Sequence, residues 1–165
     1  MAKKIAILMG SKSDLEIMKK ALEVLKKFEV EYETDIMSAH RTPEKVAEFA
    51  KNAKNNGFGV IICGAGLSAH LAGVVAAHTN LPVIGVPILA KSSPAGLDAL
   101  LSTVQMPKGV PVACVALNNS YNAALLALKI LAVSDNSIYE KLEKFKKEME
   151  QEVLSYSKEL KNNKL

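Results

Sequence analysis

The stretch KIAILMGSKSDLEIMKKALEVL, residues 4–25, decides the fold. After Lys4, residues 5–9 form a short apolar run that is typical of a buried strand, and Gly10 ends that run. From Leu15 to Leu25 the apolar residues recur at spacings of three and four, which is typical of an amphipathic helix. The stretch therefore predicts a strand, a turn and a helix, which together form the repeating unit of a parallel α/β sheet.

The same alternation continues along the chain. Further strands are expected at residues 30–37, 59–63, 82–86 and 110–116, and helices from Pro43 onward and over 68–78, 95–104 and 121–133. Strands separated by helices predict an α/β fold, a three-layer sandwich around a central parallel sheet of the flavodoxin-like or Rossmann-like kind. We expect a single domain, with the sandwich in residues 1–134 and an amphipathic C-terminal helix in 135–165.

Composition and charge exclude several classes of protein. With 165 residues of which 49% are hydrophobic, the chain can bury a core and is not disordered. Its net charge of +4 comes from Lys residues interleaved with Glu, so we expect no nucleic-acid partner. Polar residues and prolines interrupt the longest apolar region, so we expect no membrane partner. Cys63 and Cys114 are expected to be buried free thiols, which indicates a reducing, cytoplasmic location.

Two helices are too apolar for the outside of a monomer. Residues 121–133 carry only Asn122 and Lys129 as strongly polar side chains, and residues 68–77 are rich in small residues. The tail adds a narrow apolar stripe at spacings of three and four: Ile138, Leu142, Phe145, Met149, Val153, Tyr156 and Leu160. The tail could pack back on its own domain or reach across to a neighbouring subunit. Because water would otherwise wet these faces, we expect a homo-oligomer.

Ligands of such sheets bind at the carboxyl ends of the strands, so the loops after the strands are the candidate sites. The first is Gly10-Ser-Lys-Ser-Asp14, where the hydroxyls of Ser11 and Ser13 and the free amides of the next helix could cradle a phosphate. The alternative is that Ser13 or Asp14 simply caps the helix.

The second loop is Ser38-Ala-His-Arg-Thr-Pro43. His40 is suited to proton transfer near neutral pH, and the planar donor fork of Arg41 suits a phosphate or carboxylate. Thr42 could cap the helix that Pro43 begins. A structural or merely exposed histidine is the alternative for His40.

The third loop begins at Gly64-Ala65-Gly66, whose amides could approach a flat ligand closely. His70 follows it, either as a site residue or as a buried, hydrogen-bonded histidine. His78 falls in the last turn of a helix and is read as structural. The spacing of the three histidines does not fit a zinc site, so no metal is expected.

These three loops in this order resemble the PurE family, the 5-(carboxyamino)imidazole ribonucleotide mutases of purine synthesis. Three later segments extend the resemblance to residues 4–133: Gly85-Val-Pro87, Gln105-Met-Pro107 and Asn122-Ala-Ala-Leu-Leu-Ala127. Direct carboxylases of the same family typically have Lys after Ser-Ala-His and a different third loop, so the resemblance is to the mutase class. Leu67, Ser68 and Ala72 depart from the commoner pattern at the pocket.

The resemblance implies a single catalytic domain that assembles as a homo-octamer and needs no cofactor. It implies a small-molecule ribonucleotide substrate, with His40 as the catalytic acid and base. Ser11, Ser13, Ser38 and Arg41 would hold the phosphate, and Asp14 the ribose hydroxyls. Gly64, Ala65, Gly66 and His70 would complete the pocket. A direct carboxylase and a non-catalytic nucleotide-binding module remain the alternatives.

Overall fold

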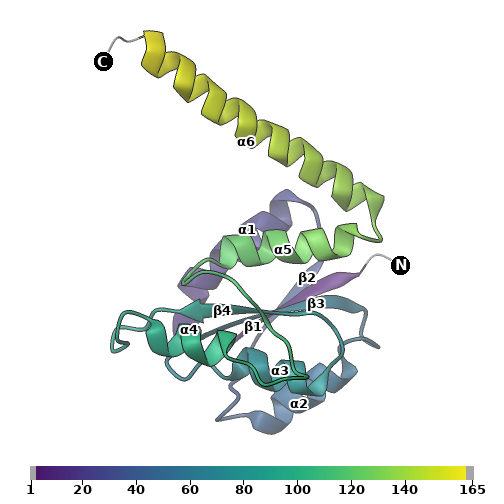
Figure 1. Ribbon diagram of the computed structural model, residues 1–165. Helices are drawn as coiled ribbons and strands as arrows, with labels where there is room; N and C mark the ends of the chain where they lie inside the picture. The colour runs from purple at the N-terminus through teal and green to yellow at the C-terminus, as the bar shows by residue number, and fades with distance from the viewer. Residues whose placement is uncertain (1–2, 163–165) are drawn as a thin grey trace.

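A parallel five-stranded sheet forms the centre of the protein in the computed structural model, which describes residues 3–162 (Figure 1). The strands are β1 (Lys4–Met9), β2 (Tyr32–Ile36), β3 (Phe58–Gly66), β4 (Val83–Ile88) and β5 (Ala113–Cys114). Their order across the sheet is β2-β1-β3-β4-β5, and every neighbouring pair is parallel. This is the flavodoxin-like order, and it confirms the expected α/β sandwich.

Helices cover both faces of the sheet. They are α1 (Leu15–Lys27), α2 (Pro43–Asn52), α3 (Leu71–His78), α4 (Leu97–Val104), α5 (Ser120–Ala132) and α6 (Asn136–Asn162), with a 3-10 turn, η1 (Lys12–Asp14), before α1. Helices α1 and α5 pack side by side on one face, and α2, α3 and α4 lie on the other (Figure 1). None of these described helices is both long and apolar enough to cross a bilayer.

The central strands supply both layers of the core by alternation. In β1, Ile5, Ile7 and Met9 face the cluster beneath α1 and α5, whereas Ala6 and Leu8 face the cluster beneath α2 and α3. All five side chains are at most 3% exposed. A continuous apolar run is thus the correct sequence signature of a strand that is buried on both faces.

Several predicted boundaries were wrong for local backbone reasons. Strand β3 runs on to Gly66, so the first three residues of the expected third loop, Gly64 to Gly66, are strand. The last strand shrinks from the expected 110–116 to two residues, in a segment where Pro111 has no amide to donate. Helix α4 begins at Leu97, because Ala95 and Gly96 have φ angles of 56° and 77°, which no α-helix contains.

Close packing of α4 on the sheet depends on Gly85 in β4. A β-carbon there would lie 2.2 Å from Cγ2 of Thr103 and 3.3 Å from Cβ of Ala72. Thr103 is buried, and its hydroxyl donates to the Ala99 carbonyl at 2.7 Å, so its side chain has little freedom to move. We expect Gly85→Ala to lower the free energy of unfolding by about 1–3 kcal/mol through overpacking. Urea denaturation measures this loss.

The control for this prediction is the double variant Gly85→Ala/Thr103→Ser. Serine removes Cγ2 but keeps the hydroxyl, so the double variant should regain most of the lost stability. A single Gly85→Ala variant as stable as the parent would contradict the packing described.

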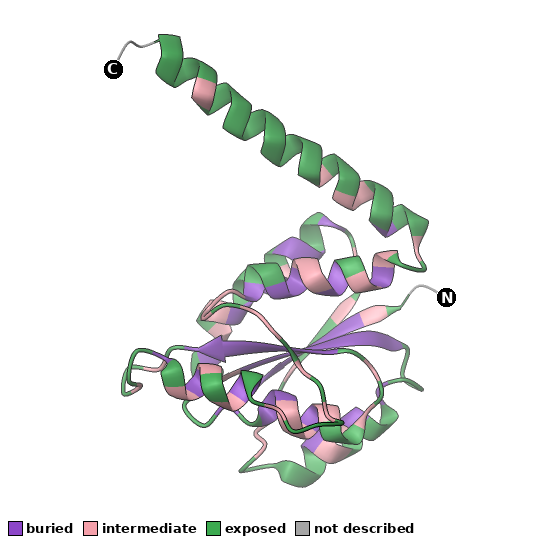
Figure 2. Cartoon of the chain, in the orientation of Figure 1, coloured by how far each residue is buried: buried purple, intermediate pink, exposed green. Residues whose placement is uncertain are grey.

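Helix α6 is only partly attached to the sandwich. At its base Ile138 is buried, and the ring of Phe145 meets that of Phe28 edge-on with centroids 5.6 Å apart. Lys141 Nζ donates to the Phe28 carbonyl and to Glu29, each at 2.8 Å. The remaining apolar stripe is 44–66% exposed: Met149, Val153, Tyr156 and Leu160. The helix therefore packs back at its base and leaves its far half uncovered (Figure 2).

Candidate active site

The three loops meet where the strand order reverses, between β1 and β3. The amide of Gly10 donates to the carbonyl of Gly64 at 3.0 Å and ties the first loop to the end of β3. A hollow of about 90 Å³ lies at this point, and its lining comes from all three loops: Gly10, Asp14, Ser38, Ala39, His40, Ala65, Gly66, Ser68, His70 and Leu71. This is the switch-point position at which ligands of such sheets bind.

The first loop is held by a reciprocal pair of hydrogen bonds. Ser11 is the N-cap of η1, and its hydroxyl accepts a long bond from the Ser13 amide at 3.4 Å, while Asp14 Oδ2 accepts the Ser11 amide at 2.9 Å. Helix capping by Ser13 or Asp14 was one of the two alternatives for this loop. In the structure the capping hydrogen bonds involve the side chains of Ser11 and Asp14. The Ser13 hydroxyl donates to Asp14 Oδ1 at 3.3 Å.

Asp14 is the most deeply placed polar group of the site, with only 6% of its surface exposed. Burial raises the pKa of Asp14 above its ordinary value, and hydrogen bonds from Ser11 and Ser13 and the charge of Arg41 oppose this. A raised folded-state pKa means that the folded protein takes up a proton here more readily than the unfolded chain. The stability that comes from keeping Asp14 protonated is therefore fully present at low pH, and it is lost as the pH rises through the pKa of Asp14 in the folded protein.

We therefore expect Asp14→Asn to be more stable than the parent at neutral pH, because asparagine has the same shape and cannot ionise. The difference should shrink as the pH falls towards about 4, where the unfolded carboxyl also takes up its proton. Thermal denaturation from pH 4 to 8 measures it.

Asp135 provides a control of opposite sign. The Ser137 hydroxyl lowers the pKa of Asp135, so Asp135→Asn should be less stable than the parent at neutral pH. Equal behaviour of the two variants across the pH range would contradict the assignment at Asp14.

The second loop is organised by Ser38. Its hydroxyl oxygen accepts the amides of His40 and Arg41 at 3.4 and 3.2 Å. Thr42 is the N-cap residue of α2, as expected, but its side chain makes no capping hydrogen bond: its hydroxyl instead accepts the Ser38 amide at 2.9 Å and donates to the Ser38 carbonyl. Ser38 thus shapes the turn that presents His40 and Arg41, and within residues 3–162 its hydroxyl acts only as an acceptor.

Arg41 crosses from the second loop to the first. One guanidinium nitrogen, Nη2, donates to the Gly10 carbonyl at 2.8 Å, and this is the only hydrogen bond of the guanidinium among the described residues. The exposed guanidinium keeps further N–H donors for a ligand. Arg41 is therefore anchored beside Ser11 with most of its fork unused.

His40 and His70 meet across the hollow. Their rings lie edge to face with centroids 5.0 Å apart, and Nε2 of His40 lies 2.9 Å from Nδ1 of His70. His70 precedes the first turn of α3 between Ala69 and Leu71, each 2% exposed, so its backbone is fixed. His70 is exposed, so the alternative that it is a buried, hydrogen-bonded histidine is wrong.

Gly64, Ala65 and Gly66 reach the site differently from the prediction. All three pair with β4 inside the sheet, so their amides do not form the open loop that was expected. A β-carbon on Gly64 would lie 2.5 Å from Sδ of Met18, and the space beside this glycine is therefore filled by the core. Ala65 and Gly66 do line the hollow, whereas Gly64 supports it from behind.

Other residues near the site divide in a similar way. Ala39 and Ser68 line the hollow but were not predicted as site residues. Their positions in the sequence, next to His40 and two residues before His70, could have indicated this.

His78 ends α3, as expected. Cys63 and Cys114 are both free, although only Cys63 is fully buried.

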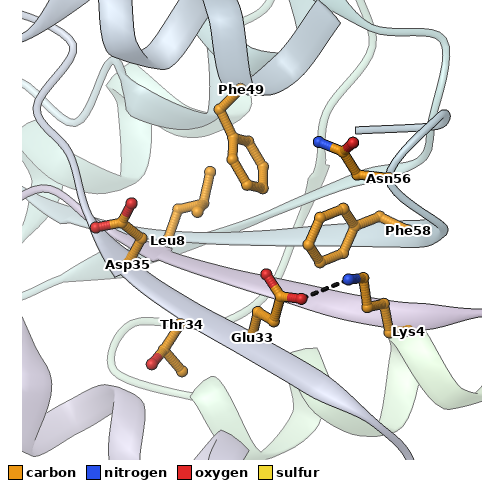
Figure 3. Close-up of a pocket in the computed structure, with 8 residues that line it drawn as sticks. All are labelled: Lys4, Leu8, Glu33, Thr34, Asp35, Phe49, Asn56 and Phe58. Atoms are coloured by element: carbon orange, nitrogen blue, oxygen red, sulfur yellow. Dashed lines mark hydrogen bonds and ion pairs between the residues drawn. The ribbon is translucent and has the colours of Figure 1, made fainter. Parts of the chain in front are cut away.

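A larger cleft of about 450 Å³ lies between α2 and the edge strand β2 (Figure 3). Its charged groups already pair with lysines: Glu33 bonds to Lys4, and Asp35 lies 2.8 Å from Lys45. Lys4 also sits 4.5 Å from the centre of the Phe58 ring. The cleft begins where β1 and β3 begin, away from the carboxyl ends that carry the histidines, so we place the active site at the smaller hollow.

The fold and the hollow together define a flavodoxin-like α/β protein with a candidate ligand site at the switch point of its sheet. The chain belongs to the AIR carboxylase family, whose model matches residues 4–152. It is 53% identical to the N5-carboxyaminoimidazole ribonucleotide mutase of Saccharolobus solfataricus over 92% of this chain and 96% of that protein. It is 52% identical to the phosphoribosylaminoimidazole carboxylase of Saccharomyces cerevisiae, over 94% of this chain but only 27% of that protein.

A solved structure agrees with these sequence matches. The crystal structure of Treponema denticola PurE superposes with a TM-score of 0.88 at 32% identity, over 96% of this chain and 99% of that one. The expected membership of the PurE family is confirmed.

Proposed function

We propose that the chain converts 5-carboxyamino-1-(5-phosphoribosyl)imidazole to 5-amino-1-(5-phosphoribosyl)imidazole-4-carboxylate in purine biosynthesis. The observation that carries this proposal is His40, held at the switch point beside an anchored Arg41 and a capped first loop. The match to nearly the full length of a relative named as a mutase supports the same activity.

The reaction needs one proton donated and one removed. Protonated His40 gives its proton to the carboxylated nitrogen, the bond from that nitrogen to the carboxylate breaks, and the bonding electrons stay on nitrogen as carbon dioxide departs. The electron-rich ring then attacks carbon dioxide through carbon 4 and forms the new carbon–carbon bond. Neutral His40 removes the proton from carbon 4 and returns to its starting form. Because the balance closes on one imidazole, no cofactor or metal is required.

The remaining site residues bind and confine the substrate. Arg41, Ser11, Ser13 and Ser38 offer donors to the phosphate, and Asp14 accepts the ribose hydroxyls. Ala65 and Gly66 leave a small space beside the ring in which carbon dioxide would be retained, so recapture benefits from proximity.

A direct carboxylase is the second candidate, because the yeast relative carries that name at nearly the same identity. That relative is several times longer than the region matched here, whereas the mutase relative corresponds over almost its whole length. Arg41 after Ser-Ala-His and Gly64-Ala65-Gly66 in the third segment also follow the mutase pattern stated above.

Labelled bicarbonate separates the two activities. The carboxyamino substrate is incubated with the protein and the label without ATP, and the product is sampled early. A mutase forms the 4-carboxylate with little label in it. Rapid use of the uncarboxylated aminoimidazole at low bicarbonate, with no use of the carboxyamino compound, would reverse the assignment.

We also propose that the protein works as a cytoplasmic homo-oligomer, with the octamer as the family's form. The two free cysteines fit a reducing compartment. Exposed apolar side chains on α4 and on the far half of α6 support assembly: Leu97, Leu101, Val104, Met149, Val153, Tyr156 and Leu160.

Light scattering coupled to size exclusion should therefore give a mass far above the 17.7 kDa of one chain. Burial of the exposed apolar side chains would drive this association. The control is a variant with Val153→Glu and Leu160→Glu, which leaves the sandwich untouched and should reduce the mass. A stable and active monomer would overturn the proposal.

A further inference from the structure

The contact between His40 and His70 has a direction that follows from imidazole chemistry. A neutral imidazole has one N–H and one bare nitrogen, so one of the two nitrogens 2.9 Å apart donates and the other accepts. In water the neutral side chain favours the tautomer with its proton on Nε2. When both rings take this tautomer, Nε2–H of His40 donates to the bare Nδ1 of His70, and neither ring adopts its less favoured form.

We infer that His70 is a positioning residue that holds the proton on Nε2 of His40, so that Nδ1 of His40 performs the chemistry. This inference rests on the proposed role of His40 and names the atom that acts. It gives His40 the arrangement in which a base is oriented by a third group.

The arrangement suits both halves of the reaction. When His40 is neutral, its bare Nδ1 can take the proton from carbon 4. When His40 is protonated, Nδ1–H can be donated to nitrogen, and Nε2–H still bonds to His70, now with a charge-assisted hydrogen bond. The ring therefore does not have to turn between the two steps. His70 itself neither gains nor loses a proton.

The local structure fixes His70 in place for this task. Ala69 and Leu71 are both buried, and the His70 amide donates to the Ser68 carbonyl at 2.8 Å. The His70 carbonyl accepts the Val74 amide at 2.9 Å in the first turn of α3. His70 is thus fixed at the start of a helix, whereas His40 lies on a loop. Contact with His70 can therefore orient the His40 ring.

The experiment compares one substitution that keeps a hydrogen-bond acceptor with one that keeps the ring but removes the acceptor. In His70→Asn the side-chain oxygen occupies the place of Nδ1, whereas His70→Phe keeps a ring and removes the acceptor. We expect His70→Phe to lower kcat on the order of ten- to a hundredfold with little change in KM, the cost of a misoriented reacting group. His70→Asn should keep most of the parent's kcat.

Nitrogen NMR of the imidazole rings tests the tautomer without substrate. The chain has only three histidines, and spectra of His40→Asn and His78→Asn assign them. In the parent, neutral His40 should show a protonated Nε2 and a bare Nδ1, and in His70→Phe the share of the Nδ1-protonated tautomer should rise towards that of a free imidazole. A parent His40 with its proton on Nδ1, or a His70→Phe variant with the parent's kcat, overturns the inference. If the parent fails to convert the carboxyamino substrate, the proposed function fails, and the tautomer spectra still decide the role of His70.

Discussion

His40→Asn should fold and bind the ribonucleotide like the parent, yet turn over at least about a hundredfold more slowly, the low end for general acid–base catalysis. Asparagine fills a similar space and can hydrogen-bond, but it cannot exchange a proton near neutral pH. The backbone of His40 is held by the Ser38 hydroxyl, and the side chain is exposed, so the fold should not depend on the imidazole. Steady-state turnover of the carboxyamino substrate, together with ribonucleotide binding by calorimetry, measures both parts of this result.

The matched control is His78→Asn, at the last residue of α3 and outside the residues that line the hollow. It should retain the parent's turnover. A His40→Asn variant with near-normal turnover would remove His40 from the mechanism, and the inference about His70 would then lose its basis.

Arg41→Ala should weaken binding of the phosphorylated substrate by roughly ten- to a hundredfold, because a charge-assisted hydrogen bond contributes about 1.5–3 kcal/mol. The guanidinium is anchored to the Gly10 carbonyl and leaves the rest of its fork free, so the loss should fall on phosphate binding. Titration with the ribonucleotide and with the matching nucleoside, which lacks the phosphate, separates this effect. Only the ribonucleotide should lose affinity.

Arg41→Lys is the comparison variant, since it keeps the charge but not the planar fork. We expect an intermediate affinity from it. An unchanged affinity of Arg41→Ala for the phosphorylated compound would give Arg41 another role, such as fixing the first loop through Gly10.

The sequence predicted the sheet well because its central strands are buried on both faces. An apolar run such as Ile5 to Met9 is readily identified as a buried strand when a helical pattern follows it. The edges were predicted less well. The strand expected at residues 110–116 is only Ala113–Cys114 in the structure. Its length depends on which backbone groups pair with β4, and the hydrophobicity of the side chains does not predict this pairing.

The candidate site was predicted at the level of loops but not of contacts. That Ser11, Asp14, His40, Arg41 and His70 share one edge follows from the carboxyl ends of parallel strands. The direct contact of His40 with His70 joins residues 30 positions apart and depends on side-chain rotamers, which no spacing rule gives. The packing around Gly64 was unpredictable for a related reason, because only the fold shows that Met18 fills the space beside it.

The partial attachment of α6 divides the chain into regions of unequal local stability. Its base can unfold only together with the contacts to Phe28 and Glu29, whereas the apolar side chains of its far half are exposed among residues 3–162. The 27 residues of α6 extend about 40 Å at 1.5 Å per residue, and an isolated helical segment of that half's length is marginal in water. In a lone chain the amides beyond Met149 should therefore open and exchange with solvent at a far lower free-energy cost than those of β1 or β3. If the proposed assembly covers the far half of α6, folding of the tail becomes coupled to protein concentration.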